Sequence, residues 1–307
     1  MKEKLIVILG PTATGKSNLA MLLAEKIPSE IVSGDSMLVY QGLDIGTAKP
    51  SKEELAKIPH HMIDILAPNE SFNVAEFQTR AAKIITQINQ ANKIPILVGG
   101  TGLYIKSLLE GYKFSEAEED SDLRQELEVF AQEFGNKALH EKLAKLSPIM
   151  ANSIHPNNVK RVIRAIELAQ AGEQIVPQEK ATELVYDAVV FGLRMDRAAL
   201  YERINQRVEM MFAAGLVDEV QKVLTSGVDK NSLALQGIGY KEVVDYLDKK
   251  ISYDKCMELV ARNTRRFAKR QFTWYKKMPY INWYDVMITD NILENILIKL
   301  EENFNLE

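Results

Sequence analysis

A glycine-rich loop near the N-terminus constrains this chain more than any other feature. Its residues match the phosphate-binding pattern G-x-x-x-x-G-K-[ST] and are Gly10, Pro11, Thr12, Ala13, Thr14, Gly15, Lys16 and Ser17. The aliphatic run Lys4–Leu9 before the loop predicts a buried strand, and helically spaced leucines follow it up to Ile27. The pattern is specific when it follows a strand and opens a helix, so the sequence predicts a diphosphate cradle.

The loop would hold phosphate through its backbone and two of its side chains. Glycines let successive N–H groups point inward, and the helix that begins near Ser17 adds the positive end of its dipole. Lys16 supplies a cation to the phosphate oxygens, and the Ser17 hydroxyl is placed to ligate Mg²⁺. The loop alone leaves the reaction open, because a kinase that moves a γ-phosphoryl group and an enzyme that releases diphosphate could both use it.

Strand-like and helix-like segments alternate through the first part of the chain. Further strands are expected at Glu30–Ser33, Met62–Leu66, Ile94–Val98 and Asp187–Met195. Asn73, three residues before Glu76, predicts the start of a helix. The alternation predicts an α/β fold, namely a parallel sheet of the P-loop NTPase type with helices on both faces.

The alternation stops in the middle of the chain. Ser115–Asp122 is acidic and is expected to be a solvated linker, and the apolar spacing from Leu123 to about Ala171 is helical throughout. We therefore expect a helical insertion domain at residues 113–185. It interrupts one α/β core made of residues 1–112 and 186–307, which is expected to be helical from Asp196 onward.

Bulk composition narrows the class of protein. The 307 residues, 46% of them hydrophobic, suffice for an α/β core and a smaller second domain. No apolar stretch is long enough to span a membrane and no secretory signal is evident, so we expect a cytoplasmic protein. The single cysteine, Cys256, excludes a disulfide framework and a cysteine-rich zinc site. The net charge of −4 means that any nucleic-acid-binding surface must be local.

Five further segments, read together with the glycine-rich loop, carry a resemblance to a known family. They are Asp35–Tyr40, Gly42–Pro50, His60–Ile65, Gly99–Tyr104 and Asn263–Trp274. In this order they closely resemble the bacterial tRNA dimethylallyltransferases, the isopentenyltransferases of tRNA. The resemblance runs over nearly the whole chain and is weakest in the helical insertion and after Trp274. The chain departs from the family in having Leu38 where Gln is usual, and with its single cysteine we expect it to be without the zinc-finger extension of eukaryotic relatives.

This resemblance implies prenyl transfer to RNA. Members of the family transfer the dimethylallyl group of dimethylallyl diphosphate to the N6 amine of the adenosine next to the anticodon, on its 3′ side. Diphosphate leaves, Mg²⁺ assists, and the target base is flipped into a channel through the core while the helical insertion closes over the RNA. The expected partners are the tRNA anticodon stem-loop and dimethylallyl diphosphate, the expected cofactor is Mg²⁺, and we expect a monomer.

The expected catalytic residues are Asp35, Thr101 and Lys16. Asp35 follows the second strand and so lies at the carboxyl edge of the sheet, where ligands bind. There it could take the proton that the attacking amine loses, a role that the resemblance matches, although capping a helix or orienting Mg²⁺ is the alternative. The resemblance places Thr101 in the active-site channel, with a structural turn as the alternative. The family pattern Arg-Ile-x-x-Arg-Val implies that Arg207 clamps the diphosphate.

Two basic helices are candidates for binding tRNA. Arg262, Arg266, Lys269 and Arg270 fall at helical spacing, with Arg265 at the edge of the stripe, and predict contact with RNA backbone rather than an ordinary solvated face. In the insertion, a second helix is expected to turn its apolar side chains inward and its basic ones toward RNA. With the segment after the second strand, it supplies the other expected tRNA-binding residues: Asp35, Ser36, Met37, Leu38, Val159, Lys160, Arg161, Val162 and Ile163.

Several further residues have less defined expected roles. Three residues of one polar loop are expected to lie near the substrate: Asp44, Thr47 and Lys49. Three aromatic residues could stack on extruded bases, with burial in the core as the alternative: Tyr40, Tyr104 and Trp274. His60 and His61 are expected to be structural, because adjacent side chains point in different directions and no third metal ligand is suitably spaced.

Two other functions stay open on the sequence. A small-molecule or nucleotide kinase of the P-loop class would use Asp35 to activate a hydroxyl. It should also carry an arginine-rich lid over ATP, whereas the segment after the sheet begins with acidic residues. A non-catalytic, nucleotide-dependent RNA-binding protein would leave Asp35 and Thr101 without a role. Prenyl transfer to tRNA is therefore the preferred hypothesis.

Overall fold

The computed structural model describes residues 2–115, 120–173 and 183–304. The chain divides into two compact units: Met1–Gly111 with Glu183–Glu307, called the core unit, and Tyr112–Thr182, called the insertion unit. The insertion unit begins one residue before, and ends three residues before, the bounds of 113–185 expected from the sequence.

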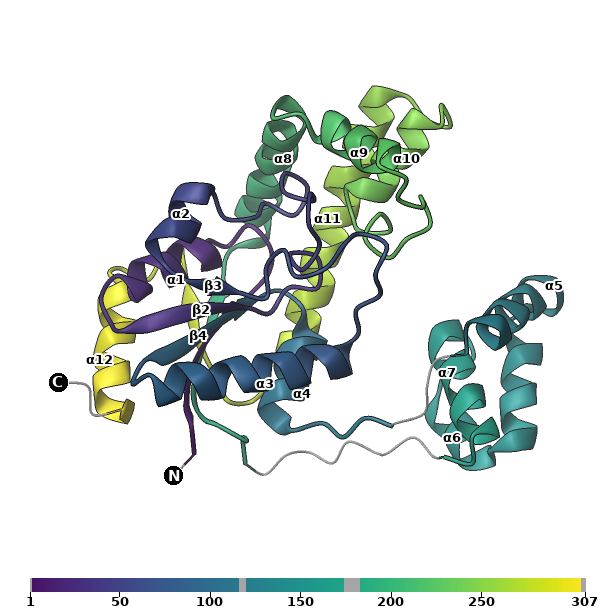
Figure 1. The fold of residues 1–307 in the computed structure, drawn as a ribbon, viewed down its shortest axis with the longest axis horizontal. Coiled ribbons are helices and arrows are strands. Elements are labelled where there is room, and N and C mark those ends of the chain that lie inside the picture. Colours follow the sequence, from purple (N-terminus) through teal and green to yellow (C-terminus); the bar gives the residue numbers. More distant parts are fainter. Residues whose placement is uncertain (1, 116–119, 174–182, 305–307) are drawn as a thin grey trace. The chain divides into compact units, whose positions relative to one another are not determined.

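The core unit is built on a six-stranded parallel sheet (Figure 1). Its strands are β1 (Lys4–Leu9), β2 (Ser29–Ser33), β3 (His60–His61), β4 (Ile94–Gly99), β5 (Asp187–Arg194) and β6 (Ile281–Asp285). They lie in the order β3-β2-β4-β1-β5-β6. The central strand β1 is buried on both faces, as expected where helices cover a parallel sheet on each side. The predicted α/β class is confirmed.

Helices cover both faces of this sheet. The described helices of the core unit are α1 (Lys16–Ala24), α2 (Lys52–Lys57), α3 (Val74–Gln90), α4 (Gly102–Glu110), α8 (Arg197–Ala213), α9 (Leu216–Thr225), α10 (Tyr240–Leu247), α11 (Tyr253–Tyr275) and α12 (Ile292–Phe304). On one face, Ile6 of β1 belongs to a cluster with Leu23 of α1 and Leu300 of α12. On the other face, Val7 belongs to the cluster that contains Phe77 of α3. The expected two-sided covering is confirmed.

The strand predicted at Met62–Leu66 is wrong. The segment that pairs with β2 is only His60–His61, because Met62 and Asp64 adopt positive φ angles of 62° and 53° that turn the chain out of the sheet. Leu66 forms an isolated bridge with Tyr40 instead. The apolar run is buried all the same, since Met62 and Leu66 pack into the core from a loop.

The expectation of helix from Asp196 onward missed β6. This strand pairs with β5 from Ile281 opposite Val190 to Asp285 opposite Arg194. Gly192 of β5 permits the pairing, since a Cβ there would lie 2.4 Å from Ile281 Cγ2. A short edge strand with polar residues carries a weak local signal, and its pairing with a distant strand decides its conformation.

The insertion unit is helical where it is described. It contains α5 (Ser121–Leu146), α6 (Pro148–Ser153) and α7 (Val159–Gln170). Leu139 and Leu143 of α5 share a buried cluster with Val162 and Ile166 of α7. The prediction of helices in this region is confirmed, although Gly135, at φ 85° and ψ 161°, divides α5 into two segments.

The predicted acidic linker Ser115–Asp122 is shorter than expected in the described residues. Asp120 caps α5 by accepting the N–H groups of Asp122 and Leu123, so the last residues of the predicted linker belong to the helix start. Residues 116–119 lie outside the described part of the chain. Among the helices that are described, none has both the length and the apolar character needed to cross a bilayer.

Candidate active site

The phosphate loop has the strand–loop–helix geometry that its sequence predicts. It leaves β1 after Leu9 and enters α1 at Lys16. Gly10 is required at φ 151°, since a Cβ there would lie 2.5 Å from the Leu193 carbonyl oxygen, and Gly15 caps α1 at φ 91°. The buried Thr14 hydroxyl donates to the Pro11 carbonyl at 2.8 Å and fixes the turn. Lys16 Nζ donates to the same carbonyl at 2.7 Å.

Residues that are far apart in the sequence meet in one cavity of about 460 Å³ beside this loop. Of the residues singled out from the sequence, it is lined by Thr12, Lys16, Ser17, Asp35, Ser36, Met37, Leu38, Thr47, Thr101, Arg207 and Arg270. The lining joins the carboxyl ends of β2 and β4 to α1, α8 and α11. Leu38, where the family usually has Gln, gives this wall an apolar side chain.

Two cations in the cavity oppose each other electrostatically. Burial and the Arg207 guanidinium lower the pKa of Lys16 from 10.5 to about 7, while the Asp35 carboxylate partly opposes this shift. Burial also lowers the pKa of Arg207, and Asp35 again acts in the other direction. Two partly buried positive groups that repel each other are suited to receive a polyanion.

Asp35 and Thr101 are held together by backbone and hydroxyl contacts. Asp35 Oδ1 accepts the Met37 N–H at 2.8 Å. Thr101, the N-cap residue of α4, accepts the Ser36 N–H at 3.1 Å through its hydroxyl and donates to Ser36 Oγ at 3.3 Å. The turns after β2 and β4 therefore form one unit. Within the described residues, no hydrogen bond is made to the second carboxylate oxygen of Asp35.

Sequence reasoning missed Gln271, which bridges two loops of the site. Its Oε1 accepts the Thr12 N–H at 2.9 Å, and its Nε2 donates to the Gly100 carbonyl at 2.9 Å. Tyr275, one turn further along α11, donates to the same carbonyl at 2.8 Å. Gln271 is buried, with 5% of its surface exposed. A polar residue at a core-facing helical position, three after the buried Ala268, is the signal that could have found it.

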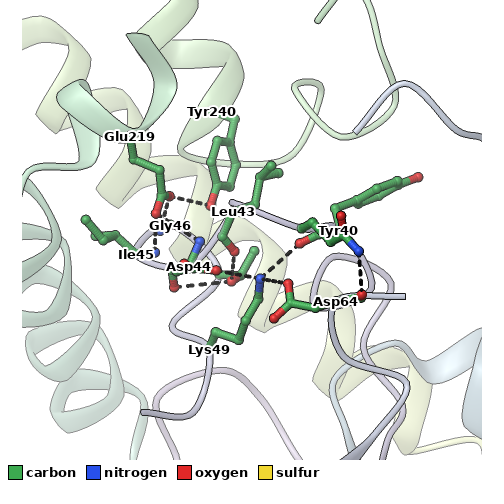
Figure 2. Close-up of polar contacts among 11 residues, drawn as sticks. Tyr40, Leu43, Asp44, Ile45, Gly46, Lys49, Asp64, Glu219 and Tyr240 are labelled. Carbon is green, nitrogen blue, oxygen red and sulfur yellow. Dashed lines mark hydrogen bonds and ion pairs between the residues drawn. The ribbon is translucent and has the colours of Figure 1, made fainter. Parts of the chain in front are cut away.

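The polar loop around residues 44–49, whose polar contacts Figure 2 shows, is only partly at the cavity. Thr47 lines it, whereas Asp44 and Lys49 line a neighbouring hollow of about 590 Å³ that shares Arg207 with it. Lys49, with 4% of its side chain exposed, pairs with Asp44 at 2.6 Å and Asp64 at 2.5 Å. These two carboxylates neutralise its charge and tie the loop to Asp64, whereas the expected place of Lys49 near the substrate stays a prediction.

The basic stripe lies on one helix, α11, as predicted, but its residues differ in exposure. Arg266 and Lys269 are exposed, and Arg270 is exposed while also lining the cavity. Arg262 is half-buried, and its Nε is buried without a hydrogen-bond partner among the described residues. Arg265 donates to Asn205 Oδ1 at 2.5 Å. The exposed part of the stripe, Arg266, Lys269 and Arg270, therefore ends at the mouth of the cavity.

The second basic helix, α7 of the insertion unit, presents only some of its predicted tRNA-binding residues. Lys160 and Arg161 are exposed and Val159 is half-buried. Val162 and Ile163 are 0% and 3% exposed, so a contact of theirs with tRNA would have to be made by the backbone, and their assignment stays a prediction. Both side chains pack in the core of the insertion unit, so they offer no side-chain surface to RNA.

The aromatic and histidine candidates are mostly structural. Tyr40 and Tyr104 are buried, and Tyr104 stacks on Phe77 with ring centroids 4.4 Å apart, so neither ring is free to stack on a base. Trp274 is 39% exposed and lies over Gly102, where a Cβ would be 2.2 Å from its Cδ1.

The two adjacent histidines are engaged by neighbouring groups. His60 contacts the Ile58 carbonyl and His61 the Glu30 carboxylate, each at 2.7 Å. The described residues hold no cluster of three or more His, Cys, Asp or Glu side chains suited to a metal ion.

Comparisons with known proteins identify relatives of this chain. A family model described as IPP transferase matches residues 38–278. The tRNA dimethylallyltransferase of Carboxydothermus hydrogenoformans is 48% identical over 93% of each chain, and that of Halalkalibacterium halodurans is 45% identical over 94% of this chain and 93% of that protein.

Solved structures give the same result. The full-length tRNA isopentenylpyrophosphate transferase from Bacillus halodurans superimposes with a TM-score of 0.74, at 43% identity over 99% of both chains. A eukaryotic dimethylallyltransferase acting on tRNA gives a TM-score of 0.81 at 27% identity, covering 99% of this chain and 80% of that one. With this family match over most of its length and these relatives over nearly all of it, the chain belongs to the IPP transferase family.

Proposed function

We propose that this chain transfers the dimethylallyl group of dimethylallyl diphosphate to the N6 amine of the tRNA adenosine on the 3′ side of the anticodon, and releases diphosphate. The observation that carries the proposal is the composition of one cavity, which joins a phosphate loop and two cations to a carboxylate and a hydroxyl. The similar proteins bear the name tRNA dimethylallyltransferase, which favours this reaction over the kinase alternative.

The cationic side of the cavity would act on the leaving group. When the C1–O bond of the donor breaks, negative charge builds on the diphosphate. Lys16, Arg207 and the N–H groups at the start of α1 would compensate that charge, and they need little reorganisation because the loop is already formed.

The donor set of the cavity also fits Mg²⁺. The Ser17 hydroxyl follows Lys16 in the first turn of α1 and lines the cavity, and a hydroxyl oxygen is a ligand that Mg²⁺ accepts alongside diphosphate oxygens and water. When bound, the ion would neutralise part of the diphosphate charge.

The opposite side of the cavity would receive the amine. As the N6–C1 bond forms, the nitrogen becomes cationic and must release a proton. Asp35 lines the cavity and its Oδ1 is engaged by the Met37 N–H, so Oδ2 is the oxygen suited to take that proton. Thr101, tied to Ser36, would fix the turn that carries Asp35 and offer a hydrogen bond near the base.

The tRNA would approach along α11. Arg266, Lys269 and Arg270 lie on the exposed face of this helix, and Arg270 also lines the cavity, so a backbone bound there would reach the cavity mouth. Lys160 and Arg161 of the insertion unit would add phosphate contacts. We propose that the enzyme works as a monomer in the cytoplasm, where it would meet its tRNA substrate.

A transfer assay tests the proposal. The full chain is incubated with labelled dimethylallyl diphosphate, unmodified tRNA and Mg²⁺, and label is sought in the RNA and mapped to the adenosine. Incorporation that requires the adenosine supports the proposal, and its absence with folded protein overturns it. ATP hydrolysis or phosphoryl transfer to a metabolite would favour the kinase instead.

A further inference from the structure

A carboxylate outside the phosphate loop organises one wall of the cavity. Glu219, in the first turn of α9, accepts three consecutive backbone N–H groups (Figure 2). Its Oε2 accepts from Asp44 at 2.9 Å and Ile45 at 2.7 Å, and its Oε1 accepts from Gly46 at 3.1 Å. The Tyr240 hydroxyl donates to Oε1 at 2.8 Å. Four donors from two separate segments thus converge on one side chain.

The loop that Glu219 holds at residues 44–46 is also held at its other end, by contacts of Lys49. The Lys49 ammonium binds the Asp44 and Asp64 carboxylates and the Tyr40 carbonyl. The Lys49 N–H also donates to the Asp44 carbonyl at 2.9 Å, which makes residues 44–49 a compact turn. We call residues 44–49 the wall loop.

The wall loop packs tightly on the ring of Tyr240, which is 1% exposed. A Cβ on Gly46 would lie 2.6 Å from the Tyr240 ring carbon Cζ, so only glycine permits this approach. Burial and the neighbouring Glu219 raise the pKa of Tyr240 far above its ordinary value, so its hydroxyl stays a donor at all physiological pH values.

The wall loop reaches the proposed diphosphate clamp. Gly46, Thr47 and Ala48 line the cavity, and the Thr47 carbonyl accepts a hydrogen bond from Arg207 Nη2 at 3.5 Å. A shift of the wall loop would therefore move the guanidinium relative to Lys16 across the cavity. Glu219 itself is not among the residues that line this cavity.

We propose that Glu219 is a positioning residue for prenyl transfer. By holding the N–H groups of Asp44, Ile45 and Gly46 it places the Thr47 carbonyl, and through this carbonyl it orients Arg207 toward the diphosphate. The inference rests on the function proposed above, because it requires Arg207 to bind the diphosphate of the donor.

A carboxylate is the group that this position needs. Glu219→Gln keeps the shape of the side chain but replaces one acceptor oxygen by an N–H₂ group, which would face backbone donors and leave them unsatisfied. Asp218→Asn is the matched control. Asp218 is exposed in the same first turn of α9 and has the same favourable relation to the helix dipole, so both variants lose one such charge.

The test combines Glu219→Gln and Arg207→Gln, singly and together, with Asp218→Asn in the full chain. For each protein, kcat and KM are measured for dimethylallyl diphosphate and tRNA, together with the Kd of inorganic diphosphate and the melting temperature. Glu219→Gln should lower kcat/KM for the donor by about tenfold and weaken diphosphate binding, with the KM for tRNA unchanged. Asp218→Asn should stay within about twofold of wild type.

The double variant decides whether Glu219 acts through Arg207. If it does, adding Glu219→Gln to Arg207→Gln should change kcat/KM by less than about twofold, whereas independent or merely structural effects would multiply. Wild-type activity in Glu219→Gln, an equal loss in Asp218→Asn, or multiplying effects would overturn the proposal. If Glu219→Gln does not fold, Tyr240→Phe replaces it in the same cycle, with a smaller loss and the same non-additivity expected.

The two proposals fail in distinguishable ways. Folded wild-type protein that transfers no prenyl group would overturn the proposed function, while the Kd of inorganic diphosphate would still report on Glu219. Wild-type transfer with an unaffected Glu219→Gln variant would overturn only the positioning role.

Discussion

Replacing Gln271 by methionine would test whether one amide sets the distance between the two sides of the cavity. The substitution keeps the length and volume of the side chain and removes both of its hydrogen bonds. The Gly100 carbonyl would keep the Tyr275 hydroxyl as a donor, but the Thr12 N–H would lose its acceptor. Most of the stabilising free energy that the variant loses is therefore that of the hydrogen bond to Thr12 in the phosphate loop.

The size of the effect follows from these hydrogen bonds. A lost hydrogen bond costs about 1 kcal/mol and an unsatisfied buried donor about 1–3 kcal/mol. Thr12 is only half-buried, so water can partly replace the amide, and we expect a loss of about 2 kcal/mol in the free energy of unfolding. For a unit of this size, that loss lowers the melting temperature by about 4–8 °C.

The kinetic effect should exceed what the stability loss explains. A displaced phosphate loop should lower kcat/KM for the donor by about ten- to a hundredfold at temperatures where the variant is fully folded. The assay is steady-state transfer of labelled dimethylallyl groups to tRNA, combined with thermal unfolding.

Two controls frame the Gln271 measurement. Tyr275→Phe removes a donor from Gly100 without touching Thr12 and should cost about 1 kcal/mol, with a smaller kinetic loss. Gln221→Met makes the same chemical change at an exposed position of α9 and should have little effect. A Gln271→Met enzyme with kcat/KM within about twofold of wild type would refute the reasoning.

Three further predictions concern charge. Burial lowers the pKa of Lys16 to about 7 and a bound diphosphate would raise it again, so binding above pH 7 takes up a proton. The affinity for inorganic diphosphate, measured by calorimetry, should therefore be full below pH 7 and fall by up to about tenfold per pH unit above it. An affinity that does not depend on pH, or the same pH dependence in Lys16→Met, would contradict this prediction. Asp35→Asn should lower kcat by about 10²–10⁴-fold with tRNA affinity unchanged, as single-turnover rates and filter binding can check; a collapse of tRNA binding would count against the base assignment. Charge reversal of Arg266 and Lys269 should weaken tRNA binding and reduce the slope of log K against log salt by about 0.7 for each phosphate that the protein no longer neutralises, so an unchanged slope would place the RNA elsewhere.

Local sequence alone determined the parts of this protein whose conformation depends on neighbours in the chain. The phosphate loop is one, since its glycines and the flanking strand and helix are contiguous. The start of α3 is another: the Asn73 side chain accepts the N–H groups of Ala75 and Glu76, as the capping pattern predicts. The basic stripe was also predictable, because helical spacing places its members on one face whatever the helix packs against.

Tertiary structure decided everything that depends on segments far apart in the chain. The strand β6 forms because β5 offers an edge, and the chain leaves β3 after two residues because Met62 turns it away. In the site, the roles of Gln271 and Glu219 likewise depend on segments that are distant in the sequence. Each is an ordinary polar residue on a helix until folding brings backbone donors from the start of the chain against it. A hydrogen bond between residues 171 to 259 positions apart leaves no periodicity or spacing in the sequence, so only the folded chain reveals it.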